Sequence, residues 1–363
     1  MNLAIVCSWL NQYGGAERVL EAVHEMYPTA PVYTSLYKPE SLPSYYRTWD
    51  IRPSFLDRLP FIKHWPGLFL PLFPLGFESL DLRGYDVVLS LTSAFGHGII
   101  TPAETAHVCY CLTPTRFLWN YHAYIEREGV GRIGRAFLPL FLNGLRTWDR
   151  LAADRVDRFI AISRTVQARI AKYYRRESRI IYPPVDTGAP VIGAESEDYF
   201  LIVSRLVPYK RVDLAVRAFN ELGLPLRIAG EGRDGAALRA MARPNVEFLG
   251  YVDEREKREL MARCRAFIFP GEEDFGIAPL EAMAAGRPVI AYAAGGALDT
   301  IIEGQTGLFF RQATPDSLIE AVHRLEETSF DTQLLRAHAE RFNVARFQRE
   351  LDQALLEACR ERG

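Results

Sequence analysis

The stretch FPGEEDFGIAPLEAMAAGRPVIAY, at residues 269–292, places two carboxylates eight positions apart around a glycine. We expect Glu273 in a loop after an apolar strand and Glu281 in the first turn of the next helix, where Pro279 is tolerated. A helix N-terminus presents unpaired N–H groups and a partial positive charge, which favour a phosphate. Carboxylates accept hydrogen bonds from sugar hydroxyls. The pattern therefore predicts a ligand with a diphosphate between two sugars, which is a nucleotide-sugar.

The spacing of these acids also has a purely structural interpretation, in which Glu281 complements the helix dipole and Glu273 is solvated. A pair of cations favours the ligand instead. Arg205 and Lys210 lie in SRLVPYKR, directly after the apolar run FLIV, at the carboxyl end of another predicted strand. There they would neutralise a diphosphate, Arg through its planar fork and Lys as a point charge. Without the acids, the same two cations would be an ordinary solvated surface pair.

A glycine pair near the N-terminus is the third feature. Gly14 and Gly15 lie in NQYGGAERV, between the first apolar run and the first amphipathic segment. They do not form the Gly-x-Gly-x-x-Gly fingerprint of dinucleotide-binding loops. Because glycine lets the backbone approach a ligand closely, the pair predicts contact with the distal phosphate or the transferred sugar.

These residues need a scaffold that brings separate loops to one edge. In the second half of the chain, short apolar runs such as 199–204, 224–230 and 265–270 alternate with amphipathic segments, and the first half alternates more loosely. This alternation predicts parallel sheets with helices on both faces, and such sheets bind ligands beyond the carboxyl ends of their strands. We therefore expect an α/β fold with two doubly wound parallel-sheet domains facing across a cleft.

The domain boundary is predicted from composition. The segment YPPVDTGAPVIGAESED is proline-rich and then small and acidic, which is typical of a linker. We expect an N-terminal, acceptor-side domain at residues 1–188, a C-terminal nucleotide-sugar-binding domain at 189–345 and a last amphipathic helix at 346–363.

Composition excludes several classes of protein. The chain has 363 residues, 48% of them hydrophobic, which is enough for two cores, and its formal net charge of −2 argues against a nucleic-acid binder. Cys109 and Cys111 have no partners at metal-ligand spacing, so they are expected to be reduced, structural residues of a cytosolic protein. The N-terminus MNLAIVCSW predicts a buried strand rather than a signal peptide, and no apolar stretch approaches the ~20 residues that span a bilayer.

Together these motifs resemble those of family 4 glycosyltransferases of the GT-B fold. The similarity rests on the Glu-x7-Glu block, on Arg205 and Lys210, on the GGAE loop and on AISRTVQARIAKYYRRESRIIYPPVD, and it extends over nearly the whole chain. It implies a retaining, metal-independent hexosyltransferase that needs no cofactor beside its nucleotide-sugar substrate. It also implies that the C-terminal helix packs back on the N-terminal domain.

The resemblance implies a role for each site residue. Glu273, Arg205 and Lys210 would be catalytic, since Glu273 would hold the hydroxyls of the donated sugar and the cations would stabilise the charge that grows on the leaving diphosphate. Glu281 would hold the nucleotide ribose. The predicted donor-binding residues are Gly14, Gly15, Val252, Asp253, Phe275, Gly276, Ile277, Ala278 and Glu281.

The segment YCLTPTRFLWNYH resembles a subgroup that makes bacterial surface polysaccharides, several members of which use GDP-mannose. We therefore expect GDP-mannose as the donor, with a UDP-sugar as the alternative, and Thr113, Arg116 and His122 on the acceptor or sugar side. Leu112 is a departure, because related sequences often have His there. His122 or His107 would be the replacement, although each is better explained as a structural or solvated residue.

The expected acceptor is a glycan or a polyprenyl-diphosphate-linked sugar. The segment 55–77 is rich in aromatic residues, leucines and prolines, with Arg58 and Lys63 near one end, and residues 132–150 repeat this composition. One interpretation is core with a covered helical hairpin, and the other is a surface that enters the bilayer. The prolines predict short helical pieces or a loop. The second interpretation predicts a cytoplasmic protein that is peripheral on the inner membrane.

Other functions fit the same features. A nucleotide-sugar epimerase of this architecture would act on the donor without an acceptor, whereas a starch-type sugar phosphorylase would need a lysine-bound pyridoxal phosphate and a much longer chain. A non-catalytic nucleotide-sugar-binding scaffold would tolerate the loss of Glu273.

Overall fold

The computed structural model describes residues 1–120, 132–188 and 196–362, with the backbone alone at residue 68 and residues 132–140. The chain divides into two compact units. Unit 1 comprises Met1–Pro184 and Phe347–Gly363, and unit 2 comprises Val185–Arg346. The boundaries predicted from the sequence lie after residues 188 and 345. Each unit has its own parallel sheet and its own core.

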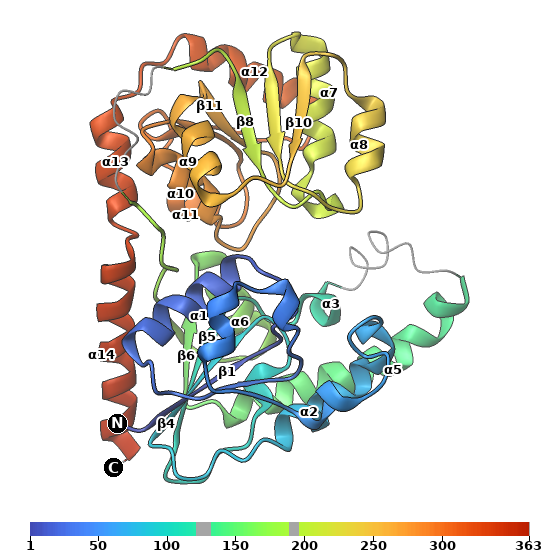
Figure 1. Ribbon diagram of the computed structural model, residues 1–363, viewed down its shortest axis with the longest axis vertical. Coiled ribbons are helices and arrows are strands. Elements are labelled where there is room, and N and C mark those ends of the chain that lie inside the picture. The colour runs from blue at the N-terminus through green and yellow to red at the C-terminus, as the bar shows by residue number, and fades with distance from the viewer. Residues whose placement is uncertain (121–131, 189–195, 363) are drawn as a thin grey trace. The chain divides into compact units, whose positions relative to one another are not determined.

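Unit 1 is built on a parallel sheet (Figure 1). Among the described residues it has seven strands, in the order β3-β2-β1-β4-β5-β6-β7. Every residue of β1, β4 and β5 is buried, which explains why these strands are almost continuous apolar runs. The short strands β2 and β3 were not foreseen from the sequence. The strands are β1 (Leu3–Cys7), β2 (Val32–Thr34), β3 (Ile51–Pro53), β4 (Val87–Thr92), β5 (Ala106–Cys111), β6 (Arg158–Ala161) and β7 (Ser178–Ile180).

The helices of unit 1 follow apolar periodicity and local capping. In α1 the buried face contains Val19, Leu20 and Val23. The start of α6 is fixed by Ser163, whose hydroxyl accepts a hydrogen bond from the N–H of Val166 at 3.1 Å. The α-helices are α1 (Gly15–Met26), α2 (Phe73–Glu78), α3 (Arg116–Trp119), α5 (Arg132–Ala152) and α6 (Arg164–Tyr173), and the 3₁₀ turns are η1 (Pro39–Ser41), η2 (Ser44–Thr48), η3 (Phe55–Arg58), η4 (Pro66–Leu72), η5 (Gly96–Gly98) and η6 (Ala153–Arg155).

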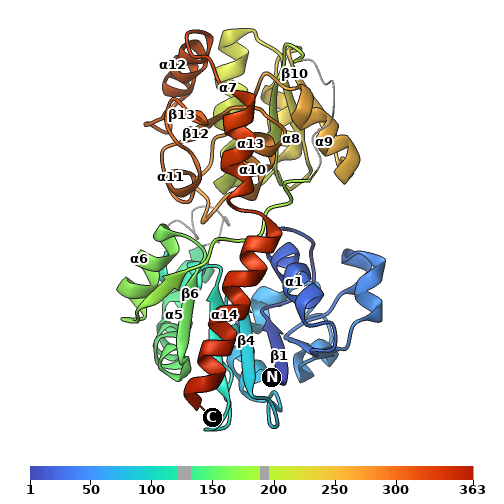
Figure 2. The same cartoon turned by 90° about the vertical axis from the view of Figure 1, so that its left-hand side faces the viewer.

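The last helix, α14 (Val344–Arg362), packs on the sheet of unit 1, and Figure 2 shows it running alongside β4 and β6. Phe347 is fully buried, and its ring lies 5.6 Å from that of Tyr110. The amide of Gln348 donates to the carbonyl of Ala22 at 3.1 Å. Farther along the helix, Glu357 lies 3.3 Å from the guanidinium of Arg158. The end of the chain therefore completes the first domain.

Unit 2 contains a second parallel sheet, with six strands among its described residues in the order β10-β9-β8-β11-β12-β13. Helices lie on both of its faces (Figure 1), with α7 against α12 and α9 against α10. The strands are β8 (Phe200–Val203), β9 (Leu226–Ala229), β10 (Val246–Gly250), β11 (Ala266–Phe269), β12 (Val289–Tyr292) and β13 (Gly307–Phe310). The helices are α7 (Val212–Leu222), α8 (Gly235–Met241), α9 (Glu254–Arg263), α10 (Ile277–Ala284), α11 (Ala297–Thr300), α12 (Pro315–Glu326) and α13 (Thr332–Glu340), with the turn η7 (Pro208–Lys210).

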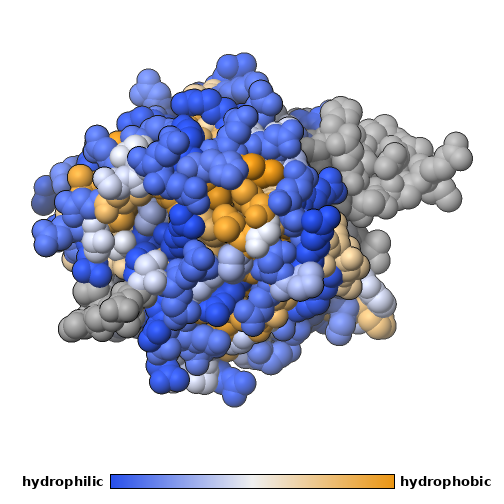
Figure 3. Space-filling view, turned by 90° about the horizontal axis from the view of Figure 1, so that it is seen from above, coloured by the Kyte–Doolittle hydropathy of each residue, from blue (hydrophilic) through white to orange (hydrophobic). Residues whose placement is uncertain are grey.

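Most large apolar side chains of the described residues are buried, and the exposed ones include Phe61, Trp65 and Tyr251. On the face seen in Figure 3, hydrophilic residues predominate and a group of hydrophobic residues lies near the centre. Within the described parts of the chain, no helix is both long and apolar enough to cross a membrane.

The proline-rich segment 55–77 forms short helical pieces, as its prolines predict, namely η3, η4 and most of α2. Much of it is core, because Phe73 is buried and Phe69 packs against the same cluster. Phe61 and Trp65 are instead 65% and 60% exposed. Their rings stack with centroids 6.0 Å apart. The expectation that the aromatic residues of this segment share one exposed surface is therefore wrong for Phe69 and Phe73.

His107 is a buried residue of β5 and does not supply the imidazole that Leu112 lacks. Its Nε2 lies 2.9 Å from the hydroxyl of Ser90 on β4. Its backbone N–H donates to the carboxylate of Asp157 at 2.8 Å. Burial, together with the charge of nearby His97, lowers the pKa of His107 to about 3. The imidazole is therefore neutral inside the folded sheet at ordinary pH.

The neutral state of His107 predicts acid sensitivity of the fold. In the unfolded chain this imidazole has a pKa of about 6.5. Below that pH the unfolded state therefore binds a proton that the folded state excludes. The free energy of unfolding should fall with decreasing pH by up to about 1.4 kcal/mol per pH unit from this residue. His107→Gln should flatten the profile between about pH 6 and about pH 4, measured by urea unfolding and tryptophan fluorescence. Equal slopes in both proteins would contradict the assignment.

Candidate functional site

The order of strands in unit 2 defines where a ligand fits. β8 lies between β9 and β11, and the chain builds β9 and β10 on one side of β8 and β11 to β13 on the other. The loops that follow β8 and β11 therefore leave adjacent parallel strands in opposite directions. In doubly wound sheets this switch point opens a crevice at the carboxyl ends of the strands. The two segments that the sequence analysis selected are these two loops.

The loops meet through a salt bridge between Lys210 and Glu273. Lys210 ends the turn η7 after β8, and Glu273 lies after β11. Their side chains are 14% and 20% exposed, so the pair is partly shielded from solvent yet accessible. Arg205 lies in the same loop as Lys210, and its guanidinium donates to the hydroxyl of Tyr209 at 3.0 Å. The structure thus brings two of the three predicted catalytic side chains into direct contact.

The acidic loop ends at a left-handed glycine that starts α10. Gly276 has φ of 91°, and a Cβ there would lie 2.9 Å from the ring of Phe269. Because side chains rarely adopt this backbone conformation, glycine is required at this position. Ile277 and Ala278 are the first two residues of α10, and Phe275, before the glycine, is buried against Phe342. The donor-binding residues predicted here therefore surround the first turn of one helix.

The position of Glu281 differs from the prediction. α10 begins at Ile277, and its first turn contains no acidic residue, so Glu281 lies one turn inside the helix. The cause is Gly276, which starts the helix earlier than Pro279 alone indicates. Glu281 is only 9% exposed and accepts a hydrogen bond from the Nζ of Lys257 at 2.9 Å. It is therefore a buried, paired carboxylate, and it does not complement the helix dipole from the first turn.

The predicted base-side residues lie between β10 and α9. Val252 is half-buried, and Asp253 is exposed. The carboxylate of Asp253 caps α9 by accepting the N–H of Glu256 at 2.8 Å. This residue therefore has a structural task in addition to the one predicted for it.

A glycine pair that the sequence analysis did not select supports the acidic loop. Gly295 and Gly296 follow β12, and the N–H of Gly296 donates to the carbonyl of Glu273 at 2.8 Å. A Cβ on Gly295 would lie 2.1 Å from that carbonyl oxygen, and one on Gly296 would lie 2.2 Å from the Cα of Phe275. No side chain fits there unless the acidic loop moves. The Gly-Gly pair two residues after the apolar run VIAY was the available signal.

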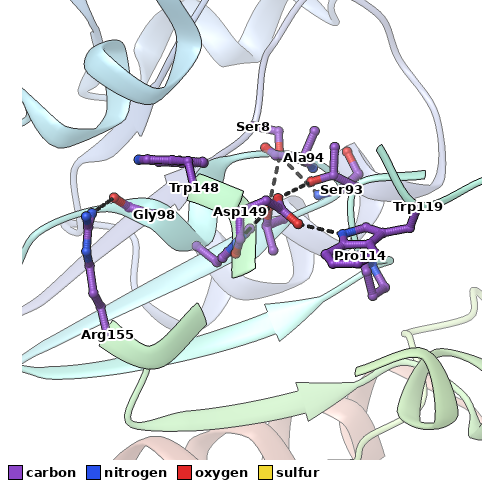
Figure 4. Close-up of polar contacts among 12 residues, drawn as sticks. Ser8, Ser93, Ala94, Gly98, Pro114, Trp119, Trp148, Asp149 and Arg155 are labelled. Atoms are coloured by element: carbon purple, nitrogen blue, oxygen red, sulfur yellow. Dashed lines mark hydrogen bonds and ion pairs between the residues drawn. The ribbon is translucent and has the colours of Figure 1, made fainter. Parts of the chain in front are cut away.

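In unit 1 the equivalent switch point lies between β1 and β4. Figure 4 shows Ser8 beside Ser93 and Ala94, and the Ser8 hydroxyl accepts the N–H of Ser93 at 3.0 Å and donates to the carbonyl of Ala94 at 2.9 Å. Gly14 caps α1 with an extended backbone, and Gly15 is the first residue of that helix. Next to them is a small cavity lined by Cys7, Ser8, Trp9, Leu10, Gln12, Ala16, Glu17, Leu20, Leu91, Ser93 and Leu112.

The electrostatics of this cavity exclude a nucleophilic thiol. Burial raises the pKa of Cys7 to about 12. Glu17, in the first turn of α1, is 4% exposed. Leu112 contributes an apolar wall where an imidazole was expected. The cavity is therefore lined by apolar side chains together with a buried carboxylate and hydroxyl groups.

The predicted acceptor-side residues follow β5. Thr113 is buried, and its hydroxyl donates to the carbonyl of Pro114 at 3.2 Å, whereas Arg116 opens α3. His122 lies outside the described residues. The fully buried carboxylate of Asp149, on α5, accepts the hydroxyl of Thr115 and the indole N–H of Trp119, each at 2.7 Å (Figure 4). This buried acid holds the segment that contains Thr113 and Arg116.

Comparisons with known proteins identify the family of the chain. The family model "Glycosyltransferase Family 4" matches residues 13–189, and the model "Glycosyl transferases group 1" matches residues 190–342. The alpha-1,3/1,6-mannosyltransferase ALG2 of Dictyostelium discoideum is 43% identical over 255 residues, covering 57% of this chain and 59% of that protein. The GDP-mannose-dependent alpha-mannosyltransferase of Mycobacterium tuberculosis is 35% identical over 142 residues, covering 38% of this chain and 35% of that protein.

The matched regions span between 35% and 61% of the length of four curated relatives. Among solved structures, Anabaena Alr3699/HepE in complex with UDP has a TM-score of 0.74 at 18% identity, covering 98% of this chain and all of that one. That likeness extends over both sheets and shows the GT-B architecture predicted from the sequence. The chain therefore belongs to glycosyltransferase family 4.

Proposed function

We propose that the protein is a retaining glycosyltransferase that moves a hexose from a nucleotide-sugar to a glycan or lipid-linked acceptor. The observation that carries this proposal is the contact between Lys210 and Glu273 at the switch point of unit 2, beside the start of α10. Mannose from GDP-mannose is the proposed donor. Two relatives named as mannosyltransferases, one of them GDP-mannose-dependent, support that choice, and the UDP complex of HepE makes a UDP-sugar the alternative.

The geometry gives each side chain a task. The donor diphosphate would lie at the N-terminus of α10, where Gly276 lets it approach the backbone. Arg205 and Lys210 would then offset the charge that develops on the leaving diphosphate. Because Glu273 already contacts Lys210, a sugar hydroxyl held by Glu273 lies next to the bond that breaks. Two fixed cations supply the positive charge that a divalent metal would otherwise bring, so the proposed reaction is metal-independent.

The remaining predicted residues complete this proposal. Val252 and Asp253 would face the base and Glu281 the ribose. Thr113 and Arg116 would face the acceptor or the transferred sugar, from the segment that Asp149 holds. No cofactor is proposed beyond the donor itself.

Two rival functions make different predictions from the same site. An epimerase would change the donor without an acceptor, whereas a transferase needs both substrates. A non-catalytic binder would keep its function when Glu273 is replaced. The direct contact of Glu273 with Lys210 favours catalysis. A carboxylate next to the cation that holds the diphosphate would weaken the binding of the diphosphate through like-charge repulsion, and this cost is explained if Glu273 binds the hydroxyls of the donated sugar.

The exposed aromatic pair of unit 1 supports a membrane-bound acceptor. Phe61 has φ of 64°, an uncommon conformation for a side chain of this size, and its ring is displayed on the surface against Trp65. Arg58 is exposed nearby in sequence, and Lys63 forms a salt bridge with Asp57 at 3.0 Å. Aromatic side chains with neighbouring cations bind the interface of anionic bilayers. We propose that the protein works in the cytoplasm and is peripheral on the inner membrane.

The donor is identified by ligand-induced stabilisation. A ligand at one hundred times its Kd adds about 2.7 kcal/mol to the stability of the state that binds it. GDP-mannose should therefore raise the melting temperature of the purified protein more than UDP-glucose or ADP-glucose does, and more than mannose alone. No shift with any nucleotide-sugar would overturn the proposed function.

Catalysis is tested by replacing the members of the central pair. Glu273→Gln should lower the transfer rate at least about tenfold and keep the affinity for GDP, because its partner is the sugar. Lys210→Met should lower the rate more than the donor affinity, since its partner gains charge in the transition state. Glu272→Gln, in the same loop, is the matched control and should retain the wild-type rate. Unchanged turnover in Glu273→Gln would contradict the catalytic role of Glu273. A wild-type protein that binds GDP but transfers no sugar would favour the scaffold, and donor turnover without acceptor would favour the epimerase.

Membrane association is tested by liposome co-sedimentation. Phe61→Ser combined with Trp65→Ser should release the protein from vesicles that contain anionic lipid, and raised salt should weaken the wild-type interaction. Leu334→Ser, a 39% exposed apolar residue in unit 2, is the control and should sediment like wild type. Wild type that stays in the supernatant at low salt would contradict the membrane proposal and leave the transferase proposal intact.

A further inference from the structure

A buried lysine lies behind the predicted ribose site. The side chain of Lys257, on α9, is 8% exposed, although lysine is among the residues least often buried. Its Nζ lies 2.9 Å from the carboxylate of Glu281 on α10 and 2.8 Å from that of Glu254. Glu254 is 55% exposed, whereas Glu281 is 9% exposed. Lys257 therefore neutralises the buried carboxylate of Glu281 and also contacts the exposed carboxylate of Glu254.

The location of Lys257 links two parts of the donor site. α9 starts directly after Val252 and Asp253, and Lys257 lies in the next turn of that helix. Its backbone N–H donates to the carbonyl of Asp253 at 2.8 Å. The side chain then crosses to Glu281 in the second turn of α10. One residue thus connects the loop predicted to face the base with the carboxylate predicted to face the ribose.

The energetics require this partner. A carboxylate as buried as Glu281 is strongly destabilising when its counter-charge is removed, because desolvation is no longer offset. The pairing also fixes the direction of the carboxylate. A carboxylate has about four lone-pair positions, so it can accept from an ammonium group and from a diol at the same time. The ammonium therefore orients the acid without competing with a ligand.

We propose that Lys257 is a positioning residue of the donor site, which aims Glu281 at the vicinal diol of a ribonucleoside diphosphate and couples that contact to the base-side loop. The proposal rests on the proposed function, because the diol belongs to the nucleotide-sugar donor. Lys257 would then determine how well the protein distinguishes ribonucleotides from nucleotides that lack the diol. A lysine that only joined α9 to α10 would affect stability without affecting this selectivity.

The test is isothermal titration of GDP and of 2′,3′-dideoxy-GDP into four proteins, namely wild type, Lys257→Met, Lys257→Arg and Arg255→Met. Wild type should prefer GDP by about tenfold or more, the usual effect of losing hydrogen bonds to a charged group. Lys257→Met should lose affinity for GDP while its affinity for the dideoxy compound changes little, so the ratio falls toward one. Lys257→Arg keeps the charge and should restore most of the ratio. Arg255→Met removes an exposed cation from the same helix and should behave like wild type.

The outcomes separate this inference from the function on which it rests. Wild type that binds neither GDP nor UDP would overturn the proposed function, and this inference with it. Wild type that discriminates, with the same ratio in Lys257→Met, would overturn the inference alone. If Lys257→Met does not fold, the ratio is read in Lys257→Gln, which removes the charge but keeps a polar group at this position. A ratio that stays at the wild-type value in Lys257→Gln would also overturn the inference.

Discussion

The candidate site of unit 2 depends on β8 and β11 lying side by side in the same direction. Their pairing, with Ala266 opposite Phe200 and Phe267 opposite Leu201, sets the two strands in register. Both strands therefore end at one edge, and the loops that follow them must meet there. Lys210 and Glu273 come from positions far apart in the chain, and no local preference places them together. The parallel register of β8 and β11 places these two side chains together at one edge of the sheet.

Close backbone packing keeps these loops in place. A Cβ on Gly232, in the loop after β9, would lie 2.2 Å from the carbonyl oxygen of Leu206, and the N–H of Leu206 donates to the carbonyl of Glu231 at 2.9 Å. The loop that contains Arg205 is thus braced from one side, as the acidic loop is braced by Gly295 and Gly296 from the other. Rigid backbone on both sides fixes charged side chains at lower entropic cost.

Much of this organisation could be predicted from the sequence, because it depends on local patterns. Buried parallel strands are apolar runs, and charged loops after such runs lie at the carboxyl edge, so the location of Arg205, Lys210 and Glu273 at this edge could be predicted from the sequence. The strands β2 and β3 were not predicted, because each has three residues and so short a segment shows no periodicity. The burial of Lys257 was not predicted for a different reason. In DEREKRELMARC it is one charge among many, and only the packing of α9 on α10 removes it from solvent.

Each acid of the Glu-x7-Glu block is paired with a lysine, and the two pairs differ in burial. Lys257 and Glu281 are 8% and 9% exposed, whereas Lys210 and Glu273 are 14% and 20% exposed. Replacing a buried counter-charge is costly, so the inner pair is the permanent one. The outer pair is closer to solvent. The Glu-x7-Glu block therefore holds Glu281 in a buried pair and Glu273 in a more accessible one, and the different roles proposed for the two acids depend on this difference in burial.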